Sequence, residues 1–284
     1  MAETMTIHMP SINLVDESFD IKKSNQYHLS ILSNENCFAF AVLDTTTNKY
    51  LVLKEVNDLS VFPLPGTTGG SERSSGNWAS VTCAIAHNKF TLIPNALFDE
   101  ENKKSLLEFN HLVSADEKIH SDILRNLKAK NLFSVSRKSE SEIKNKFTNA
   151  HIIHSFTAFA EGLLVHNKNN TEKKVFANFY SSYFEIVILD GRNLLFSNAF
   201  QYKTPEDIAY YILFVYEQLH LNPETIELVL SGEIEKTAKE HSLLYTYIRN
   251  VKFAALPDSF KYSYKFDEIP SHKFFSLFTQ YLCA

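Results

Sequence analysis

The chain has 284 residues, of which 44% are hydrophobic and 21% charged, and its net charge is −5. This balance is typical of a soluble globular protein with enough apolar material for two domains of ordinary size. The mildly acidic charge argues against a nucleic-acid-binding protein, and no apolar run reaches the length of a membrane-spanning helix. The cysteines, Cys37, Cys83 and Cys283, form no C-x-x-C pair, so neither a zinc site nor a disulfide framework is indicated.

The N-terminal residues 1–20 contain acidic side chains and lack the long apolar segment of a secretory signal peptide. We therefore expect a cytoplasmic protein. Three apolar runs follow, "YHLSILS" from Tyr27, "CFAFAVLD" from Cys37 and "KYLVLKEV" from Lys49. Short polar turns join them, which predicts an antiparallel meander of three strands.

Residues 63–78 are rich in proline, glycine and serine and predict a long exposed loop. The glycines of this loop follow neither the P-loop pattern nor G-x-G-x-x-G. The loop is either a flap over a cleft or a partner contact, or, more simply, a mobile insertion.

The rest of the first half alternates between strand and helix patterns. Ser139, followed by Glu142 three residues later, is the pattern of a capping box and opens a short helix. The predicted elements are strands within 79–94, a helix over 95–109, two strands within 117–136, a helix over 139–147, a strand over 150–155 and an apolar helix over 155–165.

A polar segment rich in Asn and Lys then predicts a linker, which divides the chain into a first half (1–166), a linker (167–174) and a second half (175–284). In the second half, Asp190-Gly191 lies between two apolar runs and predicts a hairpin. Thr204 and Pro205 are suited to the start of a helix. The predicted elements are strands over 175–180, 184–190 and 194–200, a helix over 204–221, a strand over 225–232, a helix over 233–248, a strand over 251–256 and a closing helix over 271–282.

The two meanders share a pattern of apolar residues that ends in Asp. Phe38 and Phe184 lie 146 residues apart, and so do Asp44 and Asp190, so the two segments align without a gap. An internal repeat of this size predicts two related domains that face each other.

A duplicated unit of three antiparallel strands, a helix, a parallel strand and a further helix resembles the actin-like ATPase superfamily, which is built from two ribonuclease H-like domains. Segments such as "YHLSILSNENCFAFAVLD", "NLFSVS" and "HSFTAFAEGLL" are also similar to a bacterial family of unknown function with a degenerate form of that fold. The resemblance implies an α/β fold of two tandem ribonuclease H-like domains, with mixed sheets flanked by helices. It implies no activity.

In that superfamily, each hairpin turn carries an Asp near the metal and a Gly that leaves room for phosphate, as the chemistry of Mg²⁺ and phosphate requires. In the first copy these places fall near Ser30 and Leu32, and in the second copy at Asn178 and Tyr180. Both carboxylates and both glycines are missing. We therefore expect no catalytic residue, no metal site and no ATP hydrolysis.

Two hypotheses about function follow. The first is a non-catalytic interaction or scaffold protein with a protein partner. The second is a nucleotide-binding sensor, or an ATPase- or kinase-like enzyme, that uses a cleft between the halves. ATP would then be bound by the polar turns, through Asn34, Glu35, Ser181, Ser182 and Gly232. The alternative for these five residues is an ordinary role in turns.

Two further motifs each have a functional and a structural interpretation. His151 and His154 lie three residues apart on a predicted strand, so their side chains point to opposite faces, and we favour structural histidines over metal ligands. The aromatic residues within 260–266 alternate with Lys and Ser. They fit a stacking platform or, as we prefer, a strand with one packed face.

Overall fold

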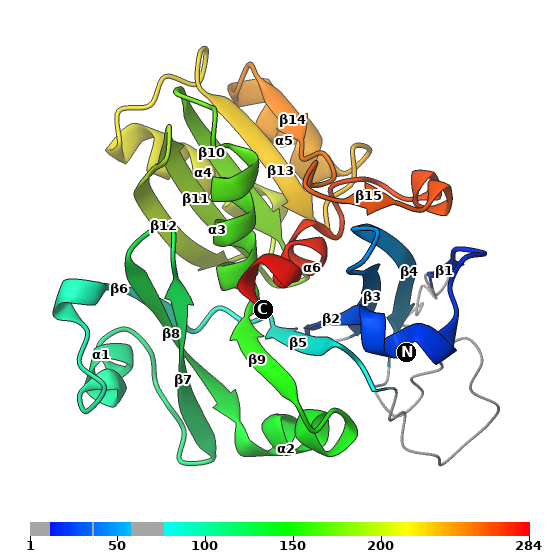
Figure 1. The fold of residues 1–284 in the computed structure, drawn as a ribbon. Helices are drawn as coiled ribbons and strands as arrows, with labels where there is room; N and C mark the ends of the chain where they lie inside the picture. The colour runs from blue at the N-terminus through cyan, green and yellow to red at the C-terminus, as the bar shows by residue number, and fades with distance from the viewer. Residues whose placement is uncertain (1–11, 36, 58–76) are drawn as a thin grey trace, which may run out of the picture.

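The computed structural model describes residues 12–35, 37–57 and 77–284. Two large sheets and a smaller third sheet are flanked by helices (Figure 1). Except for its last two residues, the loop expected at 63–78 lies outside the described residues.

The first sheet has seven strands. They are β1 (Asn13–Val15), β2 (Tyr27–Ser33), β3 (Phe38–Asp44), β4 (Lys49–Val56), β5 (Ser80–Ile85), β9 (Ala150–His154) and β15 (Lys261–Tyr262), and a 3₁₀ helix, η1 (Ile21–Gln26), precedes β2. Strands β2, β3 and β4 form the expected antiparallel meander. Strand β5 runs parallel to β2, and β9 runs parallel to β5, which gives the order β4-β3-β2-β5-β9 in the body of the sheet.

The second sheet repeats this plan. Its strands are β10 (Lys173–Phe179), β11 (Tyr183–Asp190), β12 (Asn193–Gln201), β13 (Glu227–Gly232) and β14 (Val251–Phe253). Their order is β12-β11-β10-β13-β14, in which the first three strands are antiparallel and the last two run parallel to β10. The two sheets therefore have the same topology, and the predicted duplication is confirmed.

The repeat extends to details of register. Tyr27 pairs with Asp44 in the first copy, and Lys173, 146 residues after Tyr27, pairs with Asp190 in the second. The ladder between the second and third strands also shifts at equivalent places, after Val42 in one copy and after Ile188 in the other. A shared irregularity of this kind is stronger evidence for duplication than a shared apolar pattern, because β-bulges are specific features of a strand pair.

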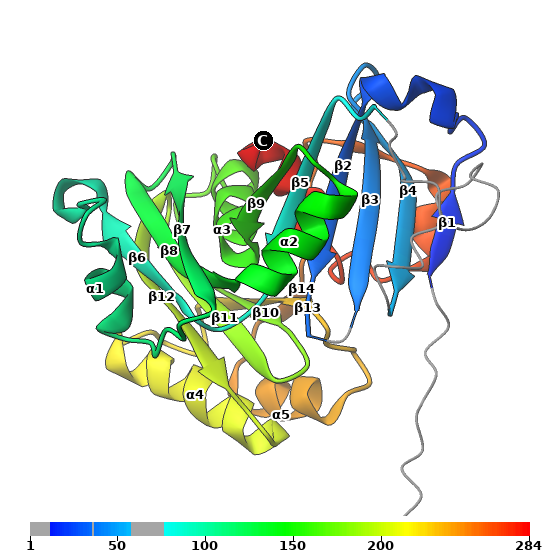
Figure 2. The ribbon, with the colours of Figure 1, turned by 90° about the horizontal axis from the view of Figure 1, so that it is seen from below.

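Helices α3 (Ser155–His166), α4 (Pro205–Gln218) and α5 (Lys239–Tyr247) pack on the two faces of the second sheet. Helices α4 and α5 cover the outer face of the second sheet (Figure 2), where Ile208 packs with Ile186. On the other face, Val187 joins the core that contains Phe156 of α3. Helix α3 therefore contributes to the contact between the two halves.

A separate unit is inserted between β5 and β9. It contains β6 (Phe90–Pro94), η3 (Asn95–Leu97), α1 (Lys103–Glu108), β7 (Glu117–Leu124), β8 (Ala129–Ser136) and α2 (Arg137–Lys146). The strands form their own antiparallel sheet in the order β6-β8-β7. In the second copy, α5 alone occupies the corresponding connection. The sequence predicted these strands but not that they form a third sheet.

The C-terminal segment crosses to the first sheet and carries η4 (Tyr264–Glu268), α6 (Phe275–Phe278) and η5 (Gln280–Cys283). Phe278 packs with Tyr50 and Leu43 in an apolar cluster. Gly162 allows α3 to approach this segment closely, because a Cβ there would lie 2.4 Å from Cγ2 of Thr279. The aromatic residues of 260–266 mostly join the same cluster, on a strand of two residues and a 3₁₀ helix.

Several boundaries differ from the prediction. The helix expected over 271–282 is wrong, because α6 has only four residues and Thr279 donates its hydroxyl to the carbonyls of Phe275 and Ala158. Helices α1 and α5 are shorter than expected. The cap of α2 is Ser136, whose Oγ accepts from the Ser139 amide, and not Ser139 itself. The division of the chain at 167–174 stays a prediction. Within the described part of the chain, no helix has the length and apolar character needed to span a membrane.

Candidate functional site at the contact between the two halves

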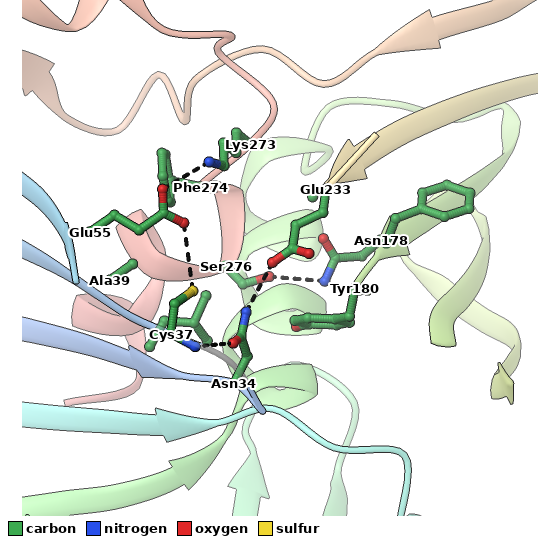
Figure 3. Close-up of a pocket in the computed structure, with 13 residues that line it drawn as sticks. Asn34, Cys37, Ala39, Glu55, Asn178, Tyr180, Glu233, Lys273, Phe274 and Ser276 are labelled. Atoms are coloured by element: carbon green, nitrogen blue, oxygen red, sulfur yellow. Dashed lines mark hydrogen bonds and ion pairs between the residues drawn. The ribbon is translucent and has the colours of Figure 1, made fainter. Parts of the chain in front are cut away.

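The turns predicted to bind nucleotide lie against each other. Asn34, in the turn after β2, donates from Nδ2 to Oε1 of Glu233 over 2.9 Å, directly beyond the end of β13 (Figure 3). Ser182, in the turn after β10, donates to Oε2 of Glu35 over 3.3 Å. The structure thus brings Asn34, Glu35 and Ser182 together, while Ser181 is exposed.

Gly232 ends β13 and has φ of +81°, a conformation that other residues rarely adopt. A Cβ at this position would lie 2.2 Å from the carbonyl oxygen of Phe179. The glycine is therefore required for the close approach of β13 to β10.

A cavity of about 20 Å³ lies between these turns. A space of this size holds about one water molecule. The residues that line the cavity come from both halves and from the C-terminal segment; they are Leu32, Asn34, Cys37, Ala39, Glu55, Asn178, Phe179, Tyr180, Gly232, Glu233, Lys273, Phe274 and Ser276. An ion pair of 3.0 Å between Lys273 and Glu55 ties the C-terminal segment to β4 beside the cavity.

Tyr180 is the residue that the sequence aligns with the glycine of the superfamily's phosphate turn. Its side chain is buried and stacks on Tyr183, with ring centroids 4.6 Å apart. The pair packs with Ala86 and Leu32, both from the first half. The turn of the second half is therefore inserted into the end of the first sheet.

Sequence reasoning missed Glu185, which is completely buried on β11. Its carboxylate accepts from Nδ2 of Asn178 over 3.2 Å and from Oγ of Ser155, at the start of α3, over 3.3 Å. Burial raises the pKa of Glu185 to about 8. The signal was available, since Glu185 is the one acid within the buried run from Tyr183 to Leu189.

Most of the chain matches one known protein family. Residues 16–251 match the family described as protein of unknown function DUF3822. The chain belongs to the DUF3822 family. No match is found among the curated proteins.

Two solved structures show the fold of this DUF3822 protein. One is a protein of Bacteroides thetaiotaomicron VPI-5482 described as having an actin-like ATPase fold and unknown function, with a TM-score of 0.71 and 24% identity over 83% of this chain and 93% of that chain. The other is described as the PilM-PilN type IV pilus biogenesis complex, with a TM-score of 0.55 and 9% identity over 90% of this chain and 97% of that chain. The chain has an actin-like ATPase fold, as the resemblance in its sequence implied.

The ladders of the DUF3822 protein correct one alignment made from the sequence. Leu32 pairs with Ala39, as Asn178 pairs with Glu185 in the second copy. Leu32 is therefore the equivalent of Asn178, two residues beyond the Ser30 expected from the sequence. Neither Leu32 nor Asn178 has a carboxylate. The reason for expecting no metal site, which is the missing carboxylates, therefore also applies at the corrected positions.

Of the two histidines singled out in the sequence, His154 has structural contacts. His154 caps α3, because its Nδ1 accepts from the amide of Phe156 over 3.1 Å, and its Nε2 then donates to the carbonyl of His87 over 3.0 Å. This pair of contacts fits a neutral imidazole. His151 is exposed on the same strand. Over residues 12–35, 37–57 and 77–284, no group of three or more His, Cys, Asp or Glu could hold a metal ion.

Proposed function

We propose that this protein is a non-catalytic interaction protein that works through its surfaces on a degenerate actin-like ATPase fold. The observation that carries the proposal is the direct contact between the two turns, where Tyr180, the residue that the sequence aligns with the phosphate-turn glycine, is buried. A nucleotide needs a cleft far larger than the space of about 20 Å³ between these turns.

The polar groups at this contact are bonded to one another. Asn34 bonds to Glu233, Ser182 bonds to Glu35, and Glu55 pairs with Lys273. Opening the halves would break these bonds and expose the stacked tyrosines to water. We infer that the two halves act as one rigid unit, which suits a scaffold better than a hinge driven by nucleotide.

The partner we propose is another protein, whose identity is open, in the cytoplasm. The net charge of −5 gives no support to a nucleic acid partner. One protein of similar fold is described as part of a complex with a second protein, PilM with PilN. That description supports an interaction role for the fold without naming a partner for this chain.

The alternative is a nucleotide sensor, or an ATPase- or kinase-like enzyme, at the same place. The observation that favours it is that Asn34, Glu35 and Ser182 converge from both halves. ATP would then bind after the turns separate, through these residues together with Ser181 and Gly232.

The test is ATP turnover and thermal unfolding of the full chain with ATP and Mg²⁺. A ligand that binds the folded state raises its melting temperature. We expect no turnover and no shift, in the wild type and in Ser181→Ala and Ser182→Ala alike. Turnover that is lost in Ser181→Ala, or a shift that is lost in Ser182→Ala, would instead support the alternative.

A further inference from the structure

The two copies differ at the outer edge of their meanders. In the first copy, β4 carries further strands on its outer side, β1 in antiparallel and β15 in parallel orientation. In the second copy the equivalent strand is β12, and within the described part of the chain it pairs with β11 alone. The duplicated plan therefore includes a place for a further strand beside β12, and no described strand occupies it.

The equivalence of the two edges extends to a single amide group. Glu55 of β4 pairs with Ala39, and Ala199 of β12 pairs with Glu185, which is 146 residues after Ala39, the offset of the repeat. The Glu55 amide donates to the backbone carbonyl just before β1 over 2.9 Å. The Ala199 amide donates instead to Oδ1 of the neighbouring Asn198, also over 2.9 Å. The Asn198 side chain therefore takes the place of the carbonyl that a further strand would supply.

Alternate residues of β12 direct their backbone groups away from β11. In an antiparallel pair, opposed residues that exchange hydrogen bonds alternate with opposed residues that do not. The Tyr202 amide donates to the carbonyl of Ser182 over 3.1 Å, so the residues two and four positions before Tyr202 also bond to β11. Ser197, Ala199 and Gln201 lie between these positions and present their N–H and C=O groups to the open side. A row of this kind binds an extended chain as a further strand.

Strand β12 lacks the features that usually protect a free edge. Its nine residues include no charged residue and no proline, and each keeps some contact with solvent. By contrast, β7, a long edge strand of the inserted sheet, carries three charged residues. Strand β14, at the other edge of the second sheet, has only three residues, one of them Lys252. Because natural proteins guard their edges with charges, prolines or short strands, the edge of β12 is suited to pairing.

The open side of β12 lies between two layers. In both views, α4 is on one side of β12 and the inserted unit on the other (Figures 1 and 2). Tyr211 of α4 stacks on Phe200 of β12, with ring centroids 4.7 Å apart. Tyr210, which is 63% exposed, lies against Tyr211 with ring centroids 5.3 Å apart. Residues 208–216 of α4 carry no charge. A strand added here would therefore meet uncharged, aromatic side chains on the α4 side.

We propose that the outer edge of β12 binds an extended segment of a partner protein as a further antiparallel strand of the second sheet. The backbone of the segment would pair with Ser197, Ala199 and Gln201, and its side chains on the α4 side would be uncharged and pack on Tyr211. The first copy favours a segment over a folded domain or a second copy of the chain, because β1 has three residues and pairs only with β4. This inference rests on the proposed interaction role and gives it a location.

The first probe is a fluorescent peptide of residues 11–18 of this chain, which contain β1, and the second alternates Val and Thr over the same length. Each is titrated into the full chain while its anisotropy is followed. We expect binding that weakens about tenfold or more in Ser197→Pro and in Gln201→Pro. Proline removes an N–H that points away from β11, and an edge strand tolerates it there. Ser197→Ala and Gln201→Ala keep the backbone and are the matched controls, which should bind as the wild type does.

Asn198→Ala tests the same edge in the opposite direction. It frees the Ala199 amide from the Asn198 side chain, so we expect binding about fivefold tighter than in the wild type. Thermal unfolding shows which variants are folded. If both proline variants fail to fold, Asn198→Ala decides alone, and binding that is unchanged or weaker in it would overturn the proposal.

Four other outcomes would also overturn it. They are no binding of either peptide, equal binding of the first peptide with Leu14→Pro, equal weakening in Ser197→Pro and Ser197→Ala, and a wild-type dimer that Ser197→Pro converts to a monomer. The last would make a second copy of the chain the occupant. Because no nucleotide is present, this test can fail while the ATP test supports a non-catalytic protein, and the reverse.

Discussion

Asn178 and Glu185 face each other across the ladder of β10 and β11, and the amide of Asn178 donates to the carboxylate of Glu185 over 3.2 Å. The sequence pattern aligns Asn178 with the Asp of the superfamily turn. An amide can donate to a buried carboxyl group in either protonation state, whereas an ionised Asp would repel the ionised form of Glu185. The residue predicted to stand in place of that Asp is therefore part of a buried network at the contact between the halves. Ser155 of α3, Ser231 of β13 and Ser276 of α6 also bond within this network.

Glu185 should make stability fall as pH rises from about 4.5, its unfolded pKa, to about 8, its folded pKa. Its pKa is raised from 4.5 to about 8 by burial, so the folded state binds the proton more tightly than the unfolded state does. The stability that protonated Glu185 contributes is fully present below its unfolded pKa of 4.5 and is lost as pH rises through about 8. We expect the free energy of unfolding of Glu185→Gln to exceed that of the wild type by several kcal/mol, about 5 at most, at alkaline pH. At acidic pH the two proteins should be nearly equal.

Urea denaturation of both proteins at acidic, neutral and alkaline pH measures this difference. Glu224→Gln, at an exposed position, is the control and should follow the wild type at every pH. A difference between Glu185→Gln and the wild type that does not change with pH would contradict the assignment of the proton to Glu185.

The local part of the fold could be predicted from the sequence, and the long-range part could not. The middle strands, which end at Asp44 and Asp190, follow from their shared apolar pattern. The hairpin after the second of them follows from the Asp190-Gly191 turn. The environment of Glu185 depends on Ser155 and on the C-terminal segment, which are distant in sequence. Nothing in the local pattern around Phe278 predicts that it packs on Tyr50 of the first sheet. The candidate turns were predictable, while the contact that closes them was not.

Buried histidines should destabilise the protein in acid. Burial lowers the pKa of His87 and of His28 from 6.5 to about 4, so both are neutral in the folded state. The stability that the neutral side chains of His87 and His28 contribute is fully present above the unfolded pKa of 6.5 and is lost as pH falls through about 4. Asp122, whose pKa burial raises to about 7, acts in the opposite direction. The effect of one histidine is therefore measured as a difference between variants.

His87→Gln is the variant that isolates this effect. We expect the wild type to lose more stability than His87→Gln between pH 6.5 and 4, by on the order of 1 kcal/mol. Denaturant melts at several pH values across this window provide the measurement. His220→Asn, at an exposed position with positive φ that Asn tolerates, should keep the wild-type dependence. If the free energy of unfolding fell equally with pH in His87→Gln and in the wild type, protonation of His87 would not be a cause of the loss of stability in acid.

The first turn of α2 distinguishes the predicted cap from the observed one. Ser136 Oγ accepts from the amide of Ser139 over 3.0 Å, and the hydroxyl of Ser139 is not required for that bond. We expect Ser136→Ala to lower the free energy of unfolding by about 1 kcal/mol. Ser139→Ala should lower it by much less. Equal losses in thermal and denaturant melts would restore Ser139 as the cap.

Gly232 should tolerate no side chain, for a reason independent of any ligand. Its φ is +81°, and a Cβ would meet the Phe179 carbonyl at 2.2 Å, a backbone atom that cannot move without breaking the ladder between β10 and β13. We expect Gly232→Ala to lose about 3 kcal/mol or more. Gly191→Ala, in a half-buried hairpin turn with φ of +58° and no contact under 3.4 Å, should lose about 1 kcal/mol. Chemical denaturation of both variants tests the contrast. If Gly232→Ala lost no more stability than Gly191→Ala, the close approach of β13 to β10 would not be the reason for this glycine.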